Sequence, residues 1–150
     1  MSVRASPMLV ALARAEEAAA CGEVPVGAVL VDDAGNVIAA AGNRVENDHD
    51  PTAHAEMLVL REGAAKLGST RLSECDLWVT LEPCAMCAAA VALARIRRLY
   101  FGAWDPKGGA VDHGPRLFDQ PTLHHRPEIY GGIDERRAAA LLRGFFQERR

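Results

Sequence analysis

The chain has 150 residues, of which 49% are hydrophobic and 25% charged, and we expect a single domain over residues 1–150 with a core of its own. It has no run of about 18 uncharged apolar residues, so no membrane-spanning helix is expected, and the acidic residues soon after the apolar N-terminal part argue against a signal peptide. Four cysteines, two of them three positions apart, favour a cytoplasmic protein with a metal site over a disulfide framework.

The net charge of −3 is unevenly distributed along the chain. Residues 1–83 carry 6 basic and 13 acidic side chains, whereas residues 84–150 carry 11 basic and 7 acidic ones. A basic C-terminal half suits a polyanionic partner, although a solvated helix face produces the same pattern.

The first 44 residues predict a helix followed by two strands. Apolar residues recur at helical spacing over 6–21, and Gly22 is placed to end this helix. The stretch "VPVGAVLVDDAGNVIAAAGNR", residues 24–44, predicts two strands joined by a tight turn at 33–36.

A second helix is expected within residues 47–68. It should end at Gly68, and Asp50 or Thr52 is a candidate to cap its start.

The rest of the chain continues to alternate strands with helices. We expect a strand at 75–81, a loop and helix in 82–96, a strand at 97–103, a glycine- and proline-rich loop at 105–115, a short strand within 127–132 and a terminal amphipathic helix over 133–150. This alternation indicates an α/β sandwich with a partly parallel sheet.

Cys84 and Cys87 lie one helical turn apart just after a proline, so both sulfur atoms can face one metal ion. Among the five histidines, His54 stands out because Glu56 follows it at the first turn of a predicted helix. Three protein ligands leave a position for water, and a carboxylate that is close to the metal but not bound to it can move the proton.

The order of these residues matches the known H-x-E…P-C-x-x-C signature of the zinc-dependent nucleobase deaminases. A structural zinc site, or a buried cysteine pair beside an unrelated histidine, is the alternative interpretation. Zinc is the expected metal, with iron as the other candidate for this ligand set.

Four stretches, "EVPVGAVLV", "DPTAHAE", "VTLEPCAMC" and "FGAWDPKGGA", resemble the bacterial tRNA-specific adenosine deaminases, and the resemblance runs over essentially the whole chain. It implies conversion of adenosine to inosine at the wobble position of a tRNA anticodon, usually that of an arginine tRNA. It also implies a cytidine deaminase-like three-layer α/β/α sandwich with a five-stranded mixed sheet, working as a homodimer.

The resemblance further implies roles for single residues. It makes His54, Cys84 and Cys87 the ligands of one zinc per subunit, with Glu56 as the proton shuttle while a zinc-bound hydroxide attacks C6 of adenine. The substrate-binding positions that it implies are Asn43 at the base, Val26 and Ala55 around it, and Asp105 and Lys107 at the flanking sugar and phosphates.

The terminal segment resembles the part of the family that packs on the anticodon loop. It carries Phe145, Phe146, Arg149 and Arg150. Aromatic rings can stack on splayed bases and arginines can pair with phosphates. One of the two phenylalanines is expected in the core, and the sequence leaves open which one contacts RNA.

Some residues depart from the family pattern or have no ligand spacing. Asp112 adds negative charge near the expected RNA, and Trp104 either stacks on a base or covers the sheet edge. Cys21 and Cys75 are expected to be small buried residues.

Two other functions remain open. A guanine or cytosine deaminase that acts on a free base or nucleoside would share the zinc site, but would not need a basic C-terminal half. A catalytically silent zinc module that binds RNA would be expected to lack the shuttle glutamate, and Glu56 is present.

Overall fold

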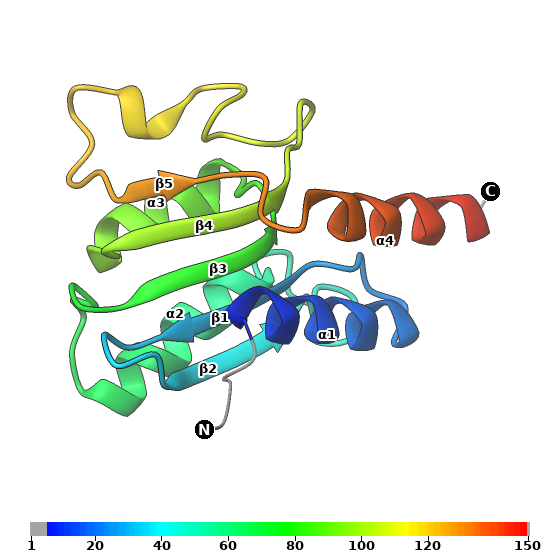
Figure 1. Ribbon diagram of the computed structural model, residues 1–150, viewed down its shortest axis with the longest axis horizontal. Coiled ribbons are helices and arrows are strands. Elements are labelled where there is room, and N and C mark those ends of the chain that lie inside the picture. Colours follow the sequence, from blue (N-terminus) through cyan, green and yellow to red (C-terminus); the bar gives the residue numbers. More distant parts are fainter. Residues whose placement is uncertain (1–5, 150) are drawn as a thin grey trace.

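The computed structural model describes residues 6–149, which form a five-stranded mixed sheet covered by helices on both faces (Figure 1). The elements in chain order are α1 (Pro7–Ala20), β1 (Gly27–Val31), β2 (Val37–Gly42), α2 (Ala55–Leu67), β3 (Asp76–Leu81), α3 (Ala85–Ala94), β4 (Arg98–Ala103), a short 3-10 turn η1 (Leu117–Asp119), β5 (Glu128–Tyr130) and α4 (Glu135–Glu148). The expected α/β class and five-stranded mixed sheet are confirmed.

The strands lie in the order β2-β1-β3-β4-β5. β1 pairs antiparallel with both β2 and β3, whereas β3–β4 and β4–β5 are parallel pairs. A parallel pair needs a crossover connection, which α3 provides between β3 and β4. The carboxyl ends of β3 and β4 therefore meet at one edge of the sheet, and the segments that leave them lie side by side there.

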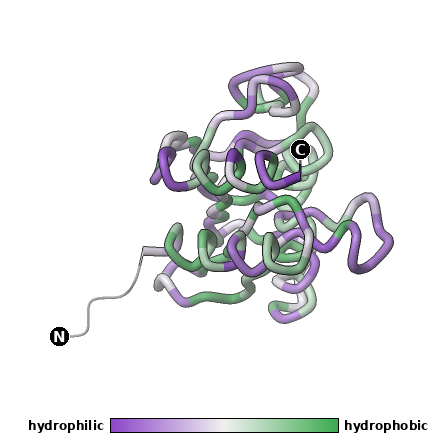
Figure 2. Tube along the Cα trace, turned by 90° about the vertical axis from the view of Figure 1, so that its right-hand side faces the viewer, coloured by the Kyte–Doolittle hydropathy of each residue, from purple (hydrophilic) through white to green (hydrophobic). Residues whose placement is uncertain are grey.

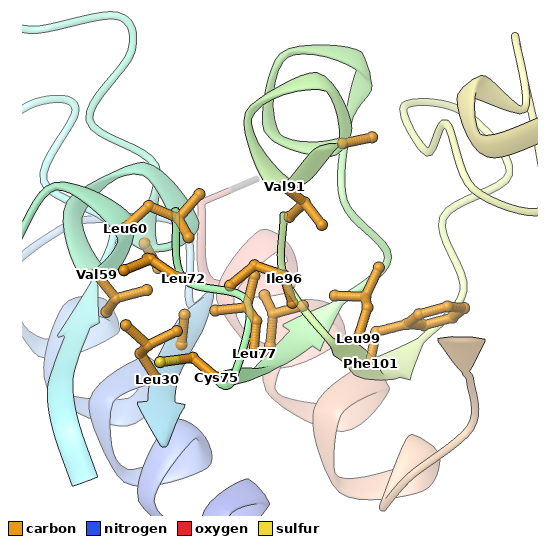
Figure 3. Close-up of a cluster of buried hydrophobic side chains, with 14 of the residues drawn as sticks. Leu30, Val59, Leu60, Leu72, Cys75, Leu77, Val91, Ile96, Leu99 and Phe101 are labelled. Atoms are coloured by element: carbon orange, nitrogen blue, oxygen red, sulfur yellow. The ribbon is translucent and has the colours of Figure 1, made fainter. Parts of the chain in front are cut away.

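Alternating residues of β1 face two separate hydrophobic clusters. Ala28 and Leu30 belong to the larger cluster under α2 and α3, and Val29 and Val31 to the smaller one under α1 and α4. The larger cluster gathers side chains from β1, α2, β3, α3 and β4 (Figure 3). Hydrophobic segments accordingly gather in the middle of the molecule, while hydrophilic ones dominate the projecting loops (Figure 2). The sheet with its two helical layers is the expected three-layer sandwich.

α1 ends in a Schellman motif, as the glycine predicted. Gly22 adopts φ +84°, its N–H donates to the Ala19 carbonyl, and the N–H of Glu23 reaches back to the carbonyl of Ala18. The helix then packs so tightly on the sheet that a Cβ on Gly27 would lie 1.9 Å from the Ala11 carbonyl oxygen.

The expected cap of α2 is wrong. The residue at the N-cap position is His54, whose side chain makes no capping bond, and the Asn43 side chain from the end of β2 accepts the Ala55 N–H at 2.8 Å instead. Asp50 is used within its own loop, where it accepts hydrogen bonds from the backbone N–H and hydroxyl of Thr52.

The expectation for the two other cysteines is half right. Cys75 is buried in the larger cluster, whereas Cys21 is exposed because it follows the last turn of α1. Among residues 6–149, no helix has the length and apolar character needed to cross a membrane.

Candidate functional site

Two helix N-termini bring three metal-binding side chains together. His54 precedes α2, Cys84 precedes α3, and Cys87 lies in the first turn of α3. The His54 Nδ1 atom lies 3.6 Å from the Cys84 Sγ and 3.5 Å from the Cys87 Sγ, and all three donor atoms lie within 4.8 Å of one another.

These distances fit zinc. A tetrahedral ion with Zn–S of about 2.3 Å and Zn–N of about 2.0 Å would separate its sulfur and nitrogen ligands by about 3.5 Å. The donor set of two thiols and one imidazole also suits this ion, and it leaves the fourth tetrahedral position for a non-protein ligand.

The surroundings of the two thiols shift their pKa values in opposite directions. The hydrogen bond from Cys87 lowers the pKa of Cys84 to about 4, and a further hydrogen bond from His54 acts in the same direction. The pKa of Cys87 is raised, because it donates to Cys84 and because it is buried. The hydrogen bond with Cys84 raises the pKa of His54. The pocket thus already favours thiolate at the more accessible sulfur.

Glu56 lies one residue inside α2 and is only 4% exposed. Burial raises its pKa, and the negative charge of Cys84 adds to the rise, whereas its own backbone N–H and the His54 charge oppose it. A carboxyl group whose pKa is moved towards neutrality is suited to accept and return a proton.

The metal-binding group opens into a pocket that gathers most of the predicted site residues. Those that line it are Val26, Asn43, His54, Glu56, Cys84, Asp105, Phe145 and Arg149. They come from six separate segments of the chain, the last of which is the C-terminal end of α4 with Phe145 and Arg149.

The remaining predicted residues lie outside this lining. Ala55 is buried, and its backbone N–H is taken by Asn43. Cys87 is fully buried. Lys107 is exposed on the loop beside the pocket, and Phe146 is 52% exposed on α4. Arg150 lies outside the described residues.

The two phenylalanines of α4 are distinguished by their surroundings. Phe145 is 9% exposed and faces the pocket, and the Arg149 guanidinium lies 4.0 Å above its ring. The ring of Phe146 packs edge-on against that of Phe145 at 5.4 Å but points to solvent. Phe145 therefore serves the core and the pocket wall together.

Trp104 covers the sheet edge, which was one of its two expected roles. Its ring packs edge-on against Phe101 and lies over Gly131 and Gly132, and its indole N–H donates to the Asp112 carboxylate at 2.8 Å. The negative charge of Asp112 is thus directed at a donor within the protein.

Two buried carboxylates in the pocket lining were not singled out from the sequence. Glu23 and Glu82 are 1% and 2% exposed, and each accepts backbone N–H groups from one loop beside the pocket. The available signal in the sequence was a charged residue directly after an apolar strand, as Glu82 is in "VTLE".

Comparison with known proteins places this geometry in a family. Residues 1–103 match the model of the cytidine and deoxycytidylate deaminase zinc-binding region. A tRNA-specific adenosine deaminase from Agrobacterium fabrum is 55% identical over 150 residues, which cover 100% of this chain and 98% of the relative. The protein of that name from Haemophilus influenzae is 47% identical over 95% of this chain and 83% of its own length.

The solved structures agree in fold. A structure from a study of A-to-I editing by tRNA:A34 deaminases at the wobble position of transfer RNA aligns with a TM-score of 0.89 and 56% identity, covering 91% of this chain and 98% of that one. A guanine deaminase from Nitrosomonas europaea aligns with a TM-score of 0.76 but only 28% identity, over 96% and 86% of the two chains. On the strength of these matches and of the His-Cys-Cys group beside a buried glutamate, the chain belongs to the tRNA-specific adenosine deaminase family.

Proposed function

We propose that the protein deaminates adenosine to inosine at the wobble position of a tRNA anticodon, with an arginine tRNA as the substrate to test first. The observation that carries the proposal is the buried Glu56 beside the His54, Cys84 and Cys87 donors, at the base of an open pocket. The high identity to relatives named tRNA-specific adenosine deaminase supports the choice of substrate.

In this proposal His54, Cys84 and Cys87 hold one zinc ion per subunit. When bound, zinc lowers the pKa of a coordinated water to about 7 and so supplies a nucleophile at neutral pH. Glu56 accepts the water proton and delivers it to the amino group that leaves C6 of the adenine as ammonia. Its burial keeps bulk water from exchanging that proton.

Asn43 is proposed to bind the base through one half of its amide. Because its Oδ1 atom accepts the Ala55 N–H, the group left for the pocket is the Nδ2 donor. Through this donor it can bind an acceptor atom of the base. Val26, which is 6% exposed, forms an apolar part of the pocket wall. The backbone N–H of Ala55 is already hydrogen-bonded to Asn43, so the role of Ala55 is to position Asn43.

The RNA around the base is proposed to meet the pocket rim. Asp105 and Phe145 line the pocket, and Arg149 and the exposed Lys107 add positive charge for phosphates. Phe146, which is exposed next to this rim, is free to stack on an unpaired base. An anticodon loop already presents unpaired bases, so extruding one costs only a few kcal/mol.

The direct test is incubation with an arginine tRNA that carries adenosine at the wobble position, with inosine measured by nucleoside mass spectrometry. Glu56→Gln should lower the rate by about 10²–10⁴-fold, the range typical of a lost general acid–base group, and should retain zinc. Full activity in this variant would contradict the assigned role.

Parallel reactions with free guanine, adenosine and cytidine test the alternative. The structural likeness to a guanine deaminase, although at only 28% identity, is the specific reason to include them. Turnover of a free base without inosine in tRNA would assign the protein to small-molecule deamination.

We further propose that residues 1–150 act as one deaminase domain in a cytoplasmic homodimer. The surface of α3 supports the homodimer, since all its residues are apolar and yet Leu93 is 62% exposed, with Met86 and Ala89 half-buried. A helix that is apolar on every side is normally covered. A second copy of the chain would cover it.

Light scattering after gel filtration tests the homodimer. Leu93→Arg should convert a particle of about twice the 16.1 kDa chain mass into one of single mass. Leu9→Arg, at a leucine 41% exposed on α1 across the sheet, is the matched control and should leave the mass unchanged. A wild-type protein of single mass would contradict the proposal.

A further inference from the structure

Glu82 directly follows β3, and its side chain is fully buried. Its Oε1 atom accepts the Asp105 N–H at 2.9 Å, and its Oε2 atom accepts the N–H groups of Val111, Asp112 and His113 at 3.1, 2.9 and 3.2 Å. The His113 Nδ1 atom also lies within hydrogen-bond distance of Oε1, at 2.8 Å. A buried carboxylate is costly unless such partners satisfy it, and here one carboxylate satisfies both ends of a single loop.

This loop, residues 105–113, is the yellow-green segment that leaves β4 (Figure 1). It lies so close to the carboxylate that a Cβ on Gly109 would be 2.5 Å from the Glu82 Cδ atom. At its start, Asp105 and Gly108 line the same pocket as Glu56. The loop that borders the pocket is therefore folded around Glu82.

We propose that Glu82 is a positioning residue, which holds the 105–113 loop ready to receive the nucleotides that flank the target base. The proposal rests on the proposed function, since it assumes a polynucleotide substrate. If the loop is already ordered in the free protein, substrate binding does not carry the entropic cost of ordering it. The groups proposed for the chemistry lie on α2 and α3, so releasing the loop should weaken substrate binding more than it slows the chemical step.

Limited proteolysis with a lysine-specific protease tests the structural half of the proposal without any substrate. The chain has two lysines, Lys107 within the loop and Lys66 in the last turn of α2. Glu82→Gln replaces one acceptor oxygen by an amide nitrogen that cannot accept. Cleavage at Lys107 should then accelerate at least about tenfold while cleavage at Lys66 stays near the wild-type rate, because only the loop opens.

The ratio of the two cleavage rates separates loop release from general destabilisation, which would accelerate both. Glu23→Gln is the matched control, because it alters a carboxylate that is equally buried but holds the loop on the other side of the pocket. Its Lys107 site should stay protected.

Gly109→Ala provides a second route to the same state, since its Cβ pushes the loop off an intact carboxylate. If Glu82→Gln does not fold, this variant decides. An unchanged Lys107 rate in the folded variants would show that other contacts hold the loop, and would overturn the proposal.

Kinetics on an anticodon stem-loop test the functional half. Both variants should raise KM at least about fivefold and change kcat less than about twofold, because the ordering cost now falls on binding. A lower kcat at unchanged KM would place Glu82 in the chemistry and overturn the positioning role. If wild-type protein deaminates no RNA, the proposed function fails, and the protease result still reports separately whether Glu82 orders the loop.

Discussion

At the scale of single residues, Asn43 has two tasks that belong to the two ends of its amide. The oxygen caps the N-terminus of α2 through the Ala55 N–H, which places His54 and Glu56 on either side of that bond. The residue also lines the pocket, where we propose that the nitrogen donates to the base. In the proposed function, substrate binding and the geometry of the metal-binding group therefore share one side chain.

Two substitutions of Asn43 should separate these tasks. Asn43→Ala removes the cap and should lower the free energy of unfolding by about 1 kcal/mol, together with the activity. Asn43→Asp keeps an acceptor for the Ala55 N–H but loses the donor, so it should keep the stability and raise KM. Urea unfolding and steady-state kinetics measure the two effects. An Asn43→Asp variant with wild-type KM would show that the amide does not donate to the substrate.

At the scale of elements, two loops that border the pocket are held by buried carboxylates. Glu23, just past α1, accepts the N–H groups of Glu46 and Asn47 at 3.1 and 2.8 Å, and so ties the loop after β2 to the end of α1. Burial on its own would raise the pKa of Glu23, but the hydrogen bonds from Asn47 and Glu46 outweigh it and leave the pKa below its ordinary value.

This shift predicts an acid-sensitive contribution to stability. A depressed carboxyl pKa stabilises the fold at pH values above the unfolded pKa of about 4.3, and the contribution disappears as the pH falls through the lower folded pKa. Wild-type protein should be more stable than Glu23→Gln at pH 7, and the gap should be smaller at pH 3. Urea unfolding at both pH values checks this, with the exposed Glu74→Gln as control. A stability gap that is the same at both pH values would contradict it.

At the scale of the whole molecule, the metal-binding group joins α2 to α3. His54 and the two cysteines lie 30 or more residues apart in sequence and meet only because both helices pack on the same face of the sheet. A metal ion bound there links the two helices and should stabilise the native state, because the unfolded chain does not hold the three donors together.

Removing the metal should therefore lower both activity and melting temperature. At a free zinc concentration of about 1,000 times Kd the ion adds about 4 kcal/mol, which corresponds to about 8–16 °C for a chain of this size. Scanning calorimetry before and after dialysis against a chelator measures the change, and added zinc should reverse it. His54→Ala should respond much less. A melting temperature that chelation leaves unchanged would contradict a zinc ion at these residues.

The sequence by itself determined the main helices and strands and the candidate metal-binding donors. Hydrophobic periodicity, Gly22 and Gly68 predicted the helices and their ends, and the spacing of Cys84 and Cys87 predicted a shared ion, because each of these signals is local. The pairing of Glu56 with His54 is likewise set within one helical turn.

The tertiary structure decided what depends on contacts between distant segments. Asn43 caps a helix that starts 12 residues later, and Glu82 holds amides up to 31 residues away. The packing of α4 turned Phe145 inward and Phe146 outward, although the two are adjacent in sequence and alike in chemistry. Neither periodicity nor motif spacing records such contacts, since the energy that selects them comes from burial and hydrogen bonding across the assembled fold.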